Sequence, residues 1–250
     1  MILASAQTRP KRGDLKSNLA DHYHLIELAS KYQVDLIVFP EMSLTGYERK
    51  KARELAFTKT DSRLNELRQL SVDKKMILIV GAPVSIKGEL YIGAFILKPD
   101  HTTSIYTKQF LHTGEQAFFS SSFNYNPNIK LEDELISLSI CADIDHPLHA
   151  LNASKNKTTL YIASLFFTPN GIPNAYKTLS YYASRYSMNV LMSNYCGPAW
   201  ELDAGGCSGF WNSKGDLIAN LNATDSGLLI IEKRNKTWIE KSIKHHKRTP

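Results

Sequence analysis

Residues 135–147, LISLSICADIDHP, constrain the fold of this chain more than any other stretch. The first six residues are mostly apolar, and a run of this length fits a buried strand better than a helix. Cys141 ends the run, and Asp143 and Asp145 follow at once. A cysteine at the end of a buried strand can present its thiol to a cleft. A free cysteine more often serves only as a small buried apolar residue, so this stretch alone does not settle its role.

Two further stretches place charged residues at the ends of strand-like runs. Residues 34–39 form a run that Pro40 breaks and Glu41 follows, and residues 102–107 form a run that Lys108 follows. Ligand sites in α/β proteins assemble at the carboxyl ends of strands. We therefore expect the carboxylate, the ammonium group and the thiol to lie close together. A cysteine beside a base and a cation is suited to acyl transfer.

The composition fits a globular α/β protein of one large domain, since 43% of the 250 residues are hydrophobic and 22% are charged. The longest apolar stretch, MILIVGAPV from Met76, is too short to span a bilayer, which argues against a membrane partner. The N-terminal residues do not resemble a signal peptide. Three cysteines, an odd number, favour free thiols in a reducing compartment. We expect a cytoplasmic protein.

The positive charge is concentrated at the C-terminus. Residues 234–250 contain six Lys or Arg against one acidic residue, Glu240, so this segment supplies +5 of the net charge of +6. A basic tail of this kind is usually a solvated surface, and it lacks interleaved aromatic residues that could stack on bases. We expect a surface helix or a subunit contact here, and no nucleic-acid partner.

Hydrophobic patterning predicts strands and helices in alternation. Residues 98–101 should form a hairpin turn, Gly81-Ala82-Pro83 should end a strand, and the last three strands should form a meander. The loop at 111–128 has no periodicity, and a long loop after a functional strand often belongs to a binding site. The expected strands are 2–7, 34–39, 76–80, 90–97, 102–107, 135–140, 158–164, 189–194, 207–212, 217–221 and 227–232; the expected helices are 14–32, 48–57, 61–74, 147–155, one within 169–187, and 238–245.

Three segments resemble the signature segments of the nitrilase, or carbon-nitrogen hydrolase, superfamily: FPEMSLTGY, YTKQFLHTGEQAFF and SICADIDHP. They occur in the family's order and at similar spacing, and the resemblance extends over nearly the whole chain. It implies a single domain over residues 1–250, built as a four-layer α-β-β-α sandwich. It also implies a homodimer or higher homo-oligomer that joins through the outer helices after the Cys141 segment.

The resemblance further implies an amidase-like enzyme that needs no metal or other cofactor. Glu41 would be the general base, Cys141 the nucleophile, and Lys108 with the Ala142 backbone N–H the oxyanion donors. The substrate would be a small linear amide or a carbamoyl compound, cleaved through a thioester. We expect the charge of Lys108 to lower the pKa of the thiol. Glu115 matches a second glutamate of the family that positions lysine and substrate; from the residues alone it is equally a solvated loop carboxylate.

Alternatives remain open at this point. A catalytically silent binding protein could keep the same fold, and an acyltransferase could use the same cysteine. His146 and His149 lack a third ligand at zinc-like spacing, and a dyad of Cys141 with His146 would have to close across a short turn. Cys196 and Cys207 lie far from charged pairs and are expected to be structural.

The chain also departs from the family pattern. Residues 145–148 read DHPL where many members have Arg-Phe-Pro-Glu, and residues 182–186 read YASRY where many have Arg-Ala-x-Glu-Asn. These differences leave the substrate within the amide class unassigned.

Overall fold

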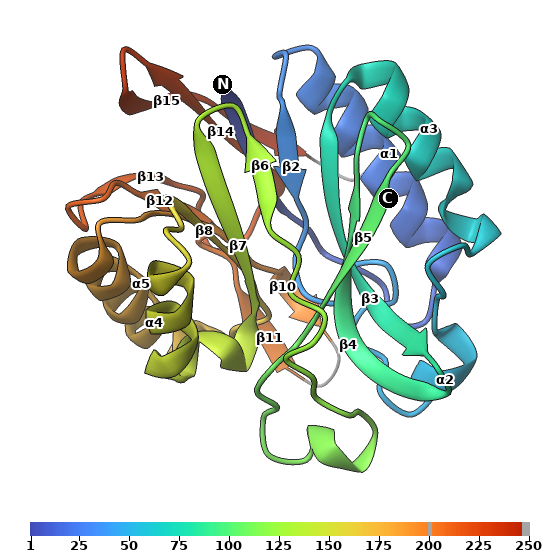
Figure 1. The fold of residues 1–250 in the computed structure, drawn as a ribbon. Helices are drawn as coiled ribbons and strands as arrows, with labels where there is room; N and C mark the ends of the chain where they lie inside the picture. The colour runs from blue at the N-terminus through green and yellow to red at the C-terminus, as the bar shows by residue number, and fades with distance from the viewer. Residues whose placement is uncertain (200–201, 247–250) are drawn as a thin grey trace.

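Two β-sheets pack face to face and carry helices on their outer faces (Figure 1). The computed structural model describes residues 1–199 and 202–246. The larger sheet has seven strands in the order β15-β14-β1-β2-β3-β4-β5, and the smaller has six in the order β13-β12-β9-β8-β7-β6. Helices α1 and α3 cover the larger sheet, and α4 and α5 cover the smaller one. This arrangement confirms the predicted four-layer α-β-β-α sandwich.

The order of elements follows the expected alternation in the first two thirds of the chain, although some bounds differ. Asp14 caps α1 as predicted, because its side chain accepts a hydrogen bond from the backbone N–H of Ser17. The helices are α1 Leu15–Ser30, α2 Ala52–Leu55, α3 Asn65–Lys74, α4 Pro147–Lys155 and α5 Ile172–Tyr186, with short 3₁₀ turns η1 Ser62–Leu64, η2 Glu115–Ala117, η3 Cys141–Asp145 and η4 Pro169–Gly171. The strands are β1 Ile2–Gln7, β2 Leu36–Val38, β3 Ile77–Ile86, β4 Glu89–Leu97, β5 Thr103–Thr107, β6 Ile129–Leu131, β7 Glu134–Ile140, β8 Leu160–Ser164, β9 Asn189–Ser193, β10 Cys196–Ala199, β11 Leu202–Gly205, β12 Gly209–Trp211, β13 Leu217–Asn220, β14 Ser226–Arg234 and β15 Thr237–His246.

Alternating side chains divide the apolar residues into three layers. In β2, Leu36 and Val38 point into the space between the sheets, whereas Ile37 packs under the helices of the larger sheet. In β8, Ile162 faces the other sheet and Tyr161 packs under α4 and α5. Because successive side chains of a strand point to opposite faces, both faces of each sheet are buried.

Strand direction brings the proposed strand ends together. Strands β1, β2 and β3 are parallel. Because β4 is antiparallel to β3 and β5 is antiparallel to β4, β5 runs in the same direction as these three strands. In the smaller sheet β7, β8 and β9 are parallel. The carboxyl ends of β2 and β5 therefore lie at one edge of the larger sheet.

The prediction that Gly81-Ala82-Pro83 ends a strand is wrong. β3 continues to Ile86 because β4 pairs with it in antiparallel register along residues 78–86. Gly81 is needed in mid-strand, since a Cβ there would lie 2.5 Å from the Met42 nitrogen and the Pro40 oxygen. The turn that carries Glu41 therefore packs directly against the β3 backbone.

The predicted helix at 238–245 is also wrong, because Thr237–His246 is strand β15, antiparallel to β14. Asn235 and Lys236 have φ values of 48° and 65°. Two consecutive residues with positive φ make the tight turn that suits a two-residue hairpin. The basic segment expected as a surface helix is thus a hairpin strand as far as residue 246, and residues 247–250 lie outside the described part of the chain.

Two further expectations fail for long-range reasons. The last three expected strands form no meander, because β14 leaves β12 and β13 and pairs with β1 in the other sheet. The expected helix at 48–57 is reduced to α2, Ala52–Leu55. The Glu48 carboxylate accepts a hydrogen bond from the Lys51 N–H, and Phe57 pairs with β3. Both contacts hold the flanks of this segment out of a helix.

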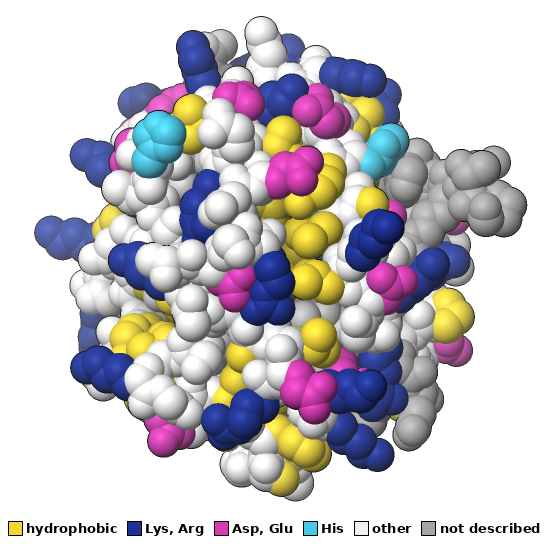
Figure 2. Space-filling view, turned by 90° about the vertical axis from the view of Figure 1, so that its right-hand side faces the viewer, with side chains coloured by type: hydrophobic (Ala, Val, Ile, Leu, Met, Phe, Trp, Pro, Cys, Tyr) yellow, Lys and Arg dark blue, Asp and Glu magenta, His cyan; other side chains and the backbone are white. Residues whose placement is uncertain are grey.

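The outer face over α1 and α3 mixes charges of both signs (Figure 2). Lys and Arg side chains on this face are interspersed with Asp and Glu, and Lys74 of α3 pairs with Glu27 of α1 at 2.8 Å. Within residues 1–199 and 202–246, the helices are all too short or too polar to cross a membrane.

Candidate active site

Lys108 is the centre of a buried charged cluster between the two sheets. It follows β5 directly, and its Nζ lies 2.8 Å from Oε1 of Glu41 and 2.9 Å from Oε1 of Glu115. The side chains of Lys108 and Glu41 are fully buried, and that of Glu115 is 1% exposed. An ammonium group between two carboxylates satisfies the requirement that buried charges be paired.

Glu115 is held on both oxygens. Its Oε1 accepts a hydrogen bond from the Tyr47 hydroxyl at 2.5 Å as well as from Lys108, and its Oε2 accepts one from the His112 backbone N–H at 2.8 Å. A carboxylate with these partners and this burial is not a solvated loop residue. Of the two interpretations of Glu115, only a role inside the cluster fits its position.

Cys141 stands at the end of β7 in a strained backbone conformation. Its φ is 45°, in the left-handed region that non-glycine residues rarely adopt. The sulfur lies 3.2 Å from Nε2 of His112 and 3.7 Å from the Phe166 carbonyl oxygen. Ala142 follows in the first turn of η3 and is 2% exposed. Every residue proposed from the sequence is therefore at a strand end or in the adjoining loop, as expected.

Asp143 connects the end of β7, which Cys141 follows, to the end of β5, which Lys108 follows. Its Oδ1 accepts the backbone N–H groups of Gln109 and Phe110 at 3.0 and 2.9 Å. Its Oδ2 accepts the Tyr106 hydroxyl at 2.7 Å and the Ile140 N–H at 2.8 Å. One fully buried carboxylate thus joins β5 of the larger sheet to β7 of the smaller. The sequence showed this residue only as a break in the apolar run.

Burial controls the protonation of the Cys141 thiol and of the Glu41 carboxyl group. It raises the pKa of the Cys141 thiol well above the usual range, and the negative charge of Glu41 adds to this effect. Lys108 opposes both and lowers the thiol pKa, as expected from the sequence, but it does not reverse the net direction. Burial also raises the pKa of Glu41 to about 7, against the lowering influence of Lys108. The resting thiol is therefore protonated, and attack requires a base beside it.

Lys108 keeps its charge in this setting. Burial alone would lower its pKa, but the charges of Glu41, Cys141 and Glu115 raise it above the usual value. A permanently charged ammonium group between the sheets is a fixed electrostatic element at which negative charge can develop.

The remaining cysteines and histidines lie apart from the cluster. Cys196 is fully buried and Cys207 partly buried, and burial raises the pKa of both. His149 uses both ring nitrogens for hydrogen bonds, with the Tyr106 and Tyr161 hydroxyls. The His146 ring stacks on Phe110 at 4.0 Å rather than reaching Cys141.

His112 is the residue that sequence analysis missed. The only signal in the sequence was its place between Lys108 and Glu115, and no local pattern shows that this loop folds back onto β7. Burial and the charge of Lys108 lower the pKa of His112, so the imidazole is neutral at pH 7. In the tautomer that carries hydrogen on Nε2, it donates a hydrogen bond to the sulfur.

We expect His112→Phe to lower kcat/KM about tenfold or more, because a hydrogen bond to a charged partner is worth about 1.5–3 kcal/mol. His112→Gln can still donate an N–H toward the sulfur and should recover part of the loss. Steady-state kinetics of both variants, after a thermal melt to check folding, measure the difference. Wild-type kinetics for the Phe variant would mean that His112 only fills space.

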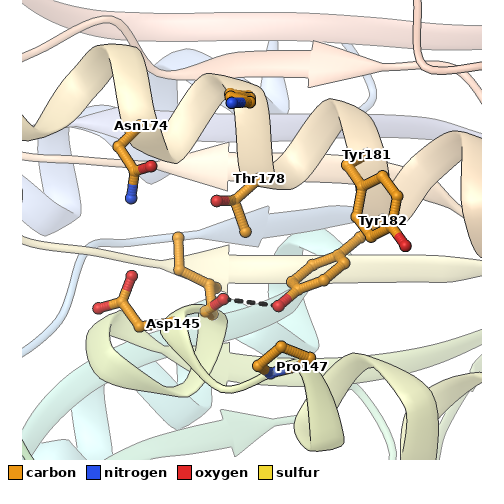
Figure 3. A pocket seen from close by; sticks show the side chains of 8 residues that line it. Asp145, Pro147, Asn174, Thr178, Tyr181 and Tyr182 are labelled. Atoms are coloured by element: carbon orange, nitrogen blue, oxygen red, sulfur yellow. Dashed lines mark hydrogen bonds between the residues drawn. The ribbon is translucent and has the colours of Figure 1, made fainter.

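A separate hollow of about 400 Å³ lies between η3 and helix α5 (Figure 3). Asn174, Thr178 and Tyr181 reach it from α5, and Asp145 and Pro147 border it from the opposite side. The Tyr182 hydroxyl donates to the Ile144 carbonyl at 2.9 Å and closes its floor. Glu41, Lys108 and Cys141 are not among the residues that line it, so this hollow is distinct from the charged cluster.

Comparison with known proteins gives matches over nearly the whole chain. Residues 2–240 match the family model for carbon-nitrogen hydrolase. The solved structure of NitN amidase from Nesterenkonia sp. AN1 has a TM-score of 0.83 and 21% sequence identity, covering 94% of this chain and 93% of that one. A glutamate-to-glutamine mutant of the Nesterenkonia amidase, showing Michael addition of acrylamide at the active site cysteine, gives 0.83 and 21% over 93% and 92%. A cysteine-to-alanine mutant in complex with butyramide gives 0.82 and 21% over 92% and 89%.

The α-β-β-α sandwich is thus the fold of amidases of the nitrilase superfamily. This chain belongs to the carbon-nitrogen hydrolase family. The family match confirms the resemblance drawn from the three sequence segments and the prediction of a carbon-nitrogen hydrolase.

Proposed function

We propose that the protein hydrolyses the carbon–nitrogen bond of a small linear amide or carbamoyl compound through a thioester at Cys141, without a cofactor. The observation that carries the proposal is the Lys108 ammonium group, which is buried between Glu41 and Glu115 and interacts with Cys141 at the end of β7. A nucleophile, a base and an oxyanion donor are then present together.

In the first half-reaction, Glu41 accepts the thiol proton as the Cys141 sulfur attacks the substrate carbonyl carbon. The carbonyl oxygen gains negative charge beside the Lys108 ammonium group and the Ala142 N–H. Glu41 then passes its proton to the leaving nitrogen, the carbon–nitrogen bond breaks, and ammonia or an amine departs. A carboxyl group with a pKa of about 7 suits both the removal and the return of a proton near neutral pH.

In the second half-reaction, water attacks the thioester while Glu41 accepts one of its protons. The tetrahedral intermediate expels the sulfur, which takes that proton back from Glu41, and the acid is released. Glu115 contributes by fixing Lys108, since its Oε1 bonds both the ammonium group and Tyr47.

The similar structures support this chemistry by analogy. A glutamate-to-glutamine mutant of the Nesterenkonia amidase carries acrylamide added to its active site cysteine, and a cysteine-to-alanine mutant holds butyramide. For this chain, the likeness supports an amide as the class of substrate.

Mass spectrometry of the intact protein mixed with a panel of amides, ureides and nitriles tests the proposal. We expect an acyl mass on Cys141, and ammonia or amine in solution, with Cys141→Ala as the inert control. Added hydroxylamine distinguishes acyl transfer from hydrolysis, since a transferase would convert the acyl group wholly to the hydroxamate. No acyl mass and no amine from any compound would favour a binding protein.

The cellular setting and assembly proposed here rest on other features. Cys141, Cys196 and Cys207 are all free thiols, which supports a reducing, cytoplasmic location. For a homodimer, the supporting feature is the face of α4 and α5 beside the hollow in Figure 3, where Leu148 is 52% and Tyr181 56% exposed. Sedimentation of the purified protein measures the assembly.

A further inference from the structure

Two buried oxygen atoms beside the thiol lack a hydrogen-bond partner. These are Oε2 of Glu41 and the hydroxyl of Tyr195, and both residues are fully buried. Buried polar groups are nearly always hydrogen-bonded, so each exception calls for an explanation. In the proposed mechanism Glu41 accepts the thiol proton, and Oε2 is available for this because Oε1 is paired with Lys108. The Tyr195 hydroxyl has no such assignment.

Tyr195 belongs to an aromatic wall of the site. It lies between β9 and β10, and its ring packs on Phe166 with 5.0 Å between centroids. The Phe166 carbonyl is the one that contacts the Cys141 sulfur, and the Phe166 ring is 5.1 Å from Tyr47, which binds Glu115. Tyr195 therefore stands in the same shell of residues as the nucleophile.

The hydroxyl lies within electrostatic reach of the reacting groups. Burial raises the pKa of Tyr195 well above its usual value, and the charges of Glu41 and then Cys141 add to that effect. The hydroxyl therefore stays protonated in the presence of the charges of Glu41 and Cys141.

The position of a bound amide follows from the proposed mechanism, on which this inference rests. The carbonyl carbon must meet the Cys141 sulfur, and the carbonyl oxygen must face Lys108. The nitrogen then lies toward Glu41, because Glu41 delivers its proton there. A primary amide carries two N–H donors on that nitrogen, and a phenolic oxygen can accept one of them.

We propose that Oε2 of Glu41 and the Tyr195 hydroxyl accept the two N–H groups of a primary carboxamide, so that the site selects substrates ending in CONH₂. Simple carboxamides and terminal ureido groups both have this end, and the leaving group is then ammonia. A substituent on the nitrogen would remove one of the two N–H donors and leave one of the two acceptors without a partner.

The effect on stability distinguishes this role from a structural one. Removing a buried hydroxyl that has no partner should leave stability unchanged or raise it, because an unsatisfied group is costly to bury. Tyr195→Phe should therefore keep or gain stability in a thermal melt while it loses recognition of the primary amide. If the hydroxyl stabilised the fold, Tyr195→Phe would lower the stability of the protein.

The test compares kcat/KM for hydrolysis of propionamide and of N,N-dimethylpropionamide, measured as release of ammonia or dimethylamine. Both reactions require the carbonyl carbon at the Cys141 sulfur. We expect wild type to favour propionamide, and Tyr195→Phe to hydrolyse propionamide about threefold to tenfold more slowly with little change for the dimethyl reagent. Tyr176→Phe is the control for activity, because Tyr176 lies on α5, where its ring packs on Trp211 and its hydroxyl donates to the Cys207 carbonyl.

The outcomes separate this inference from the proposed function. If wild type forms the acyl-enzyme but Tyr195→Phe reacts with both reagents as wild type does, the proposed function stands and the role of Tyr195 is overturned. Equal slowing of both reagents would also overturn it, since the hydroxyl would then not distinguish the two nitrogens. If wild-type Cys141 reacts with neither reagent and forms no acyl-enzyme from any amide, both proposals fail.

Discussion

Glu41→Gln is expected to slow thioester formation by on the order of a hundredfold to ten-thousandfold, the usual effect of a general base. Glutamine keeps the volume of the side chain but cannot accept the thiol proton. The ionised carboxylate is the active form, so the wild-type rate should rise as pH increases through about 7, the raised pKa of Glu41. The variant should lose that rise. Single-turnover measurements of the acyl mass across a pH series give both results.

Glu134→Gln provides a matched control for this experiment. Glu134 is also a buried glutamate paired with a lysine, at 2.7 Å from Lys233, but it lies at the opposite end of β7 from Cys141. It should keep the wild-type rate and pH dependence. If Glu41→Gln also keeps them, Glu41 is not the base and the mechanism proposed above is wrong.

Lys108→Met is expected to reduce both stability and activity. It leaves the carboxylates of Glu41 and Glu115 buried without their cation, and breaking a buried ion pair in this way costs about 3–5 kcal/mol. The midpoint of urea unfolding at pH 8 should fall accordingly. Lowering the pH should narrow the gap to wild type, because protonation removes the unpaired negative charge.

The double variant Lys108→Met/Glu115→Gln separates the two effects. With one carboxylate removed it should recover part of the lost stability, yet it should stay inactive because no ammonium group faces the developing oxyanion. Recovered activity in the double variant would show that Lys108 serves only to neutralise its neighbours. A single variant as stable as wild type would mean that solvent reaches the carboxylates.

The sequence predicted most strongly the parts of the site that lie next to strand ends. Glu41, Lys108 and Cys141 each follow an apolar β-prone run, and that local pattern determines where the chain leaves a sheet. The number of strands in the larger sheet was harder to predict from the sequence. β14 joins this sheet by pairing with β1 at the other end of the chain, and β15 then pairs with β14. Asn235 and Lys236 form the turn of that hairpin, whereas the prediction from the sequence was a helix at 238–245.

The residues that surround the cluster could not be inferred in this way. His112, Asp143 and Tyr195 come from a loop, a turn and a strand junction, and each meets the site through contacts distant in sequence. Gly81 was visible in the sequence, but its local pattern led to a wrong prediction. A glycine beside Ala and Pro usually marks a strand end, but here it allows the Glu41 turn to approach β3 closely. Only the packed backbone distinguishes the two cases.

The Asp143 bridge has a consequence for how the enzyme matures. Glu41 and Lys108 belong to one sheet and Cys141 to the other, so the reactive centre does not exist until the sheets have docked. The larger sheet is itself incomplete until β14, near the end of the chain, pairs with β1. A chain emerging from the ribosome therefore carries the Cys141 thiol, from its synthesis until the sheets dock, without Glu41 and Lys108 in place beside it. The rate at which activity appears during refolding then reports the final docking of the sheets rather than the formation of secondary structure.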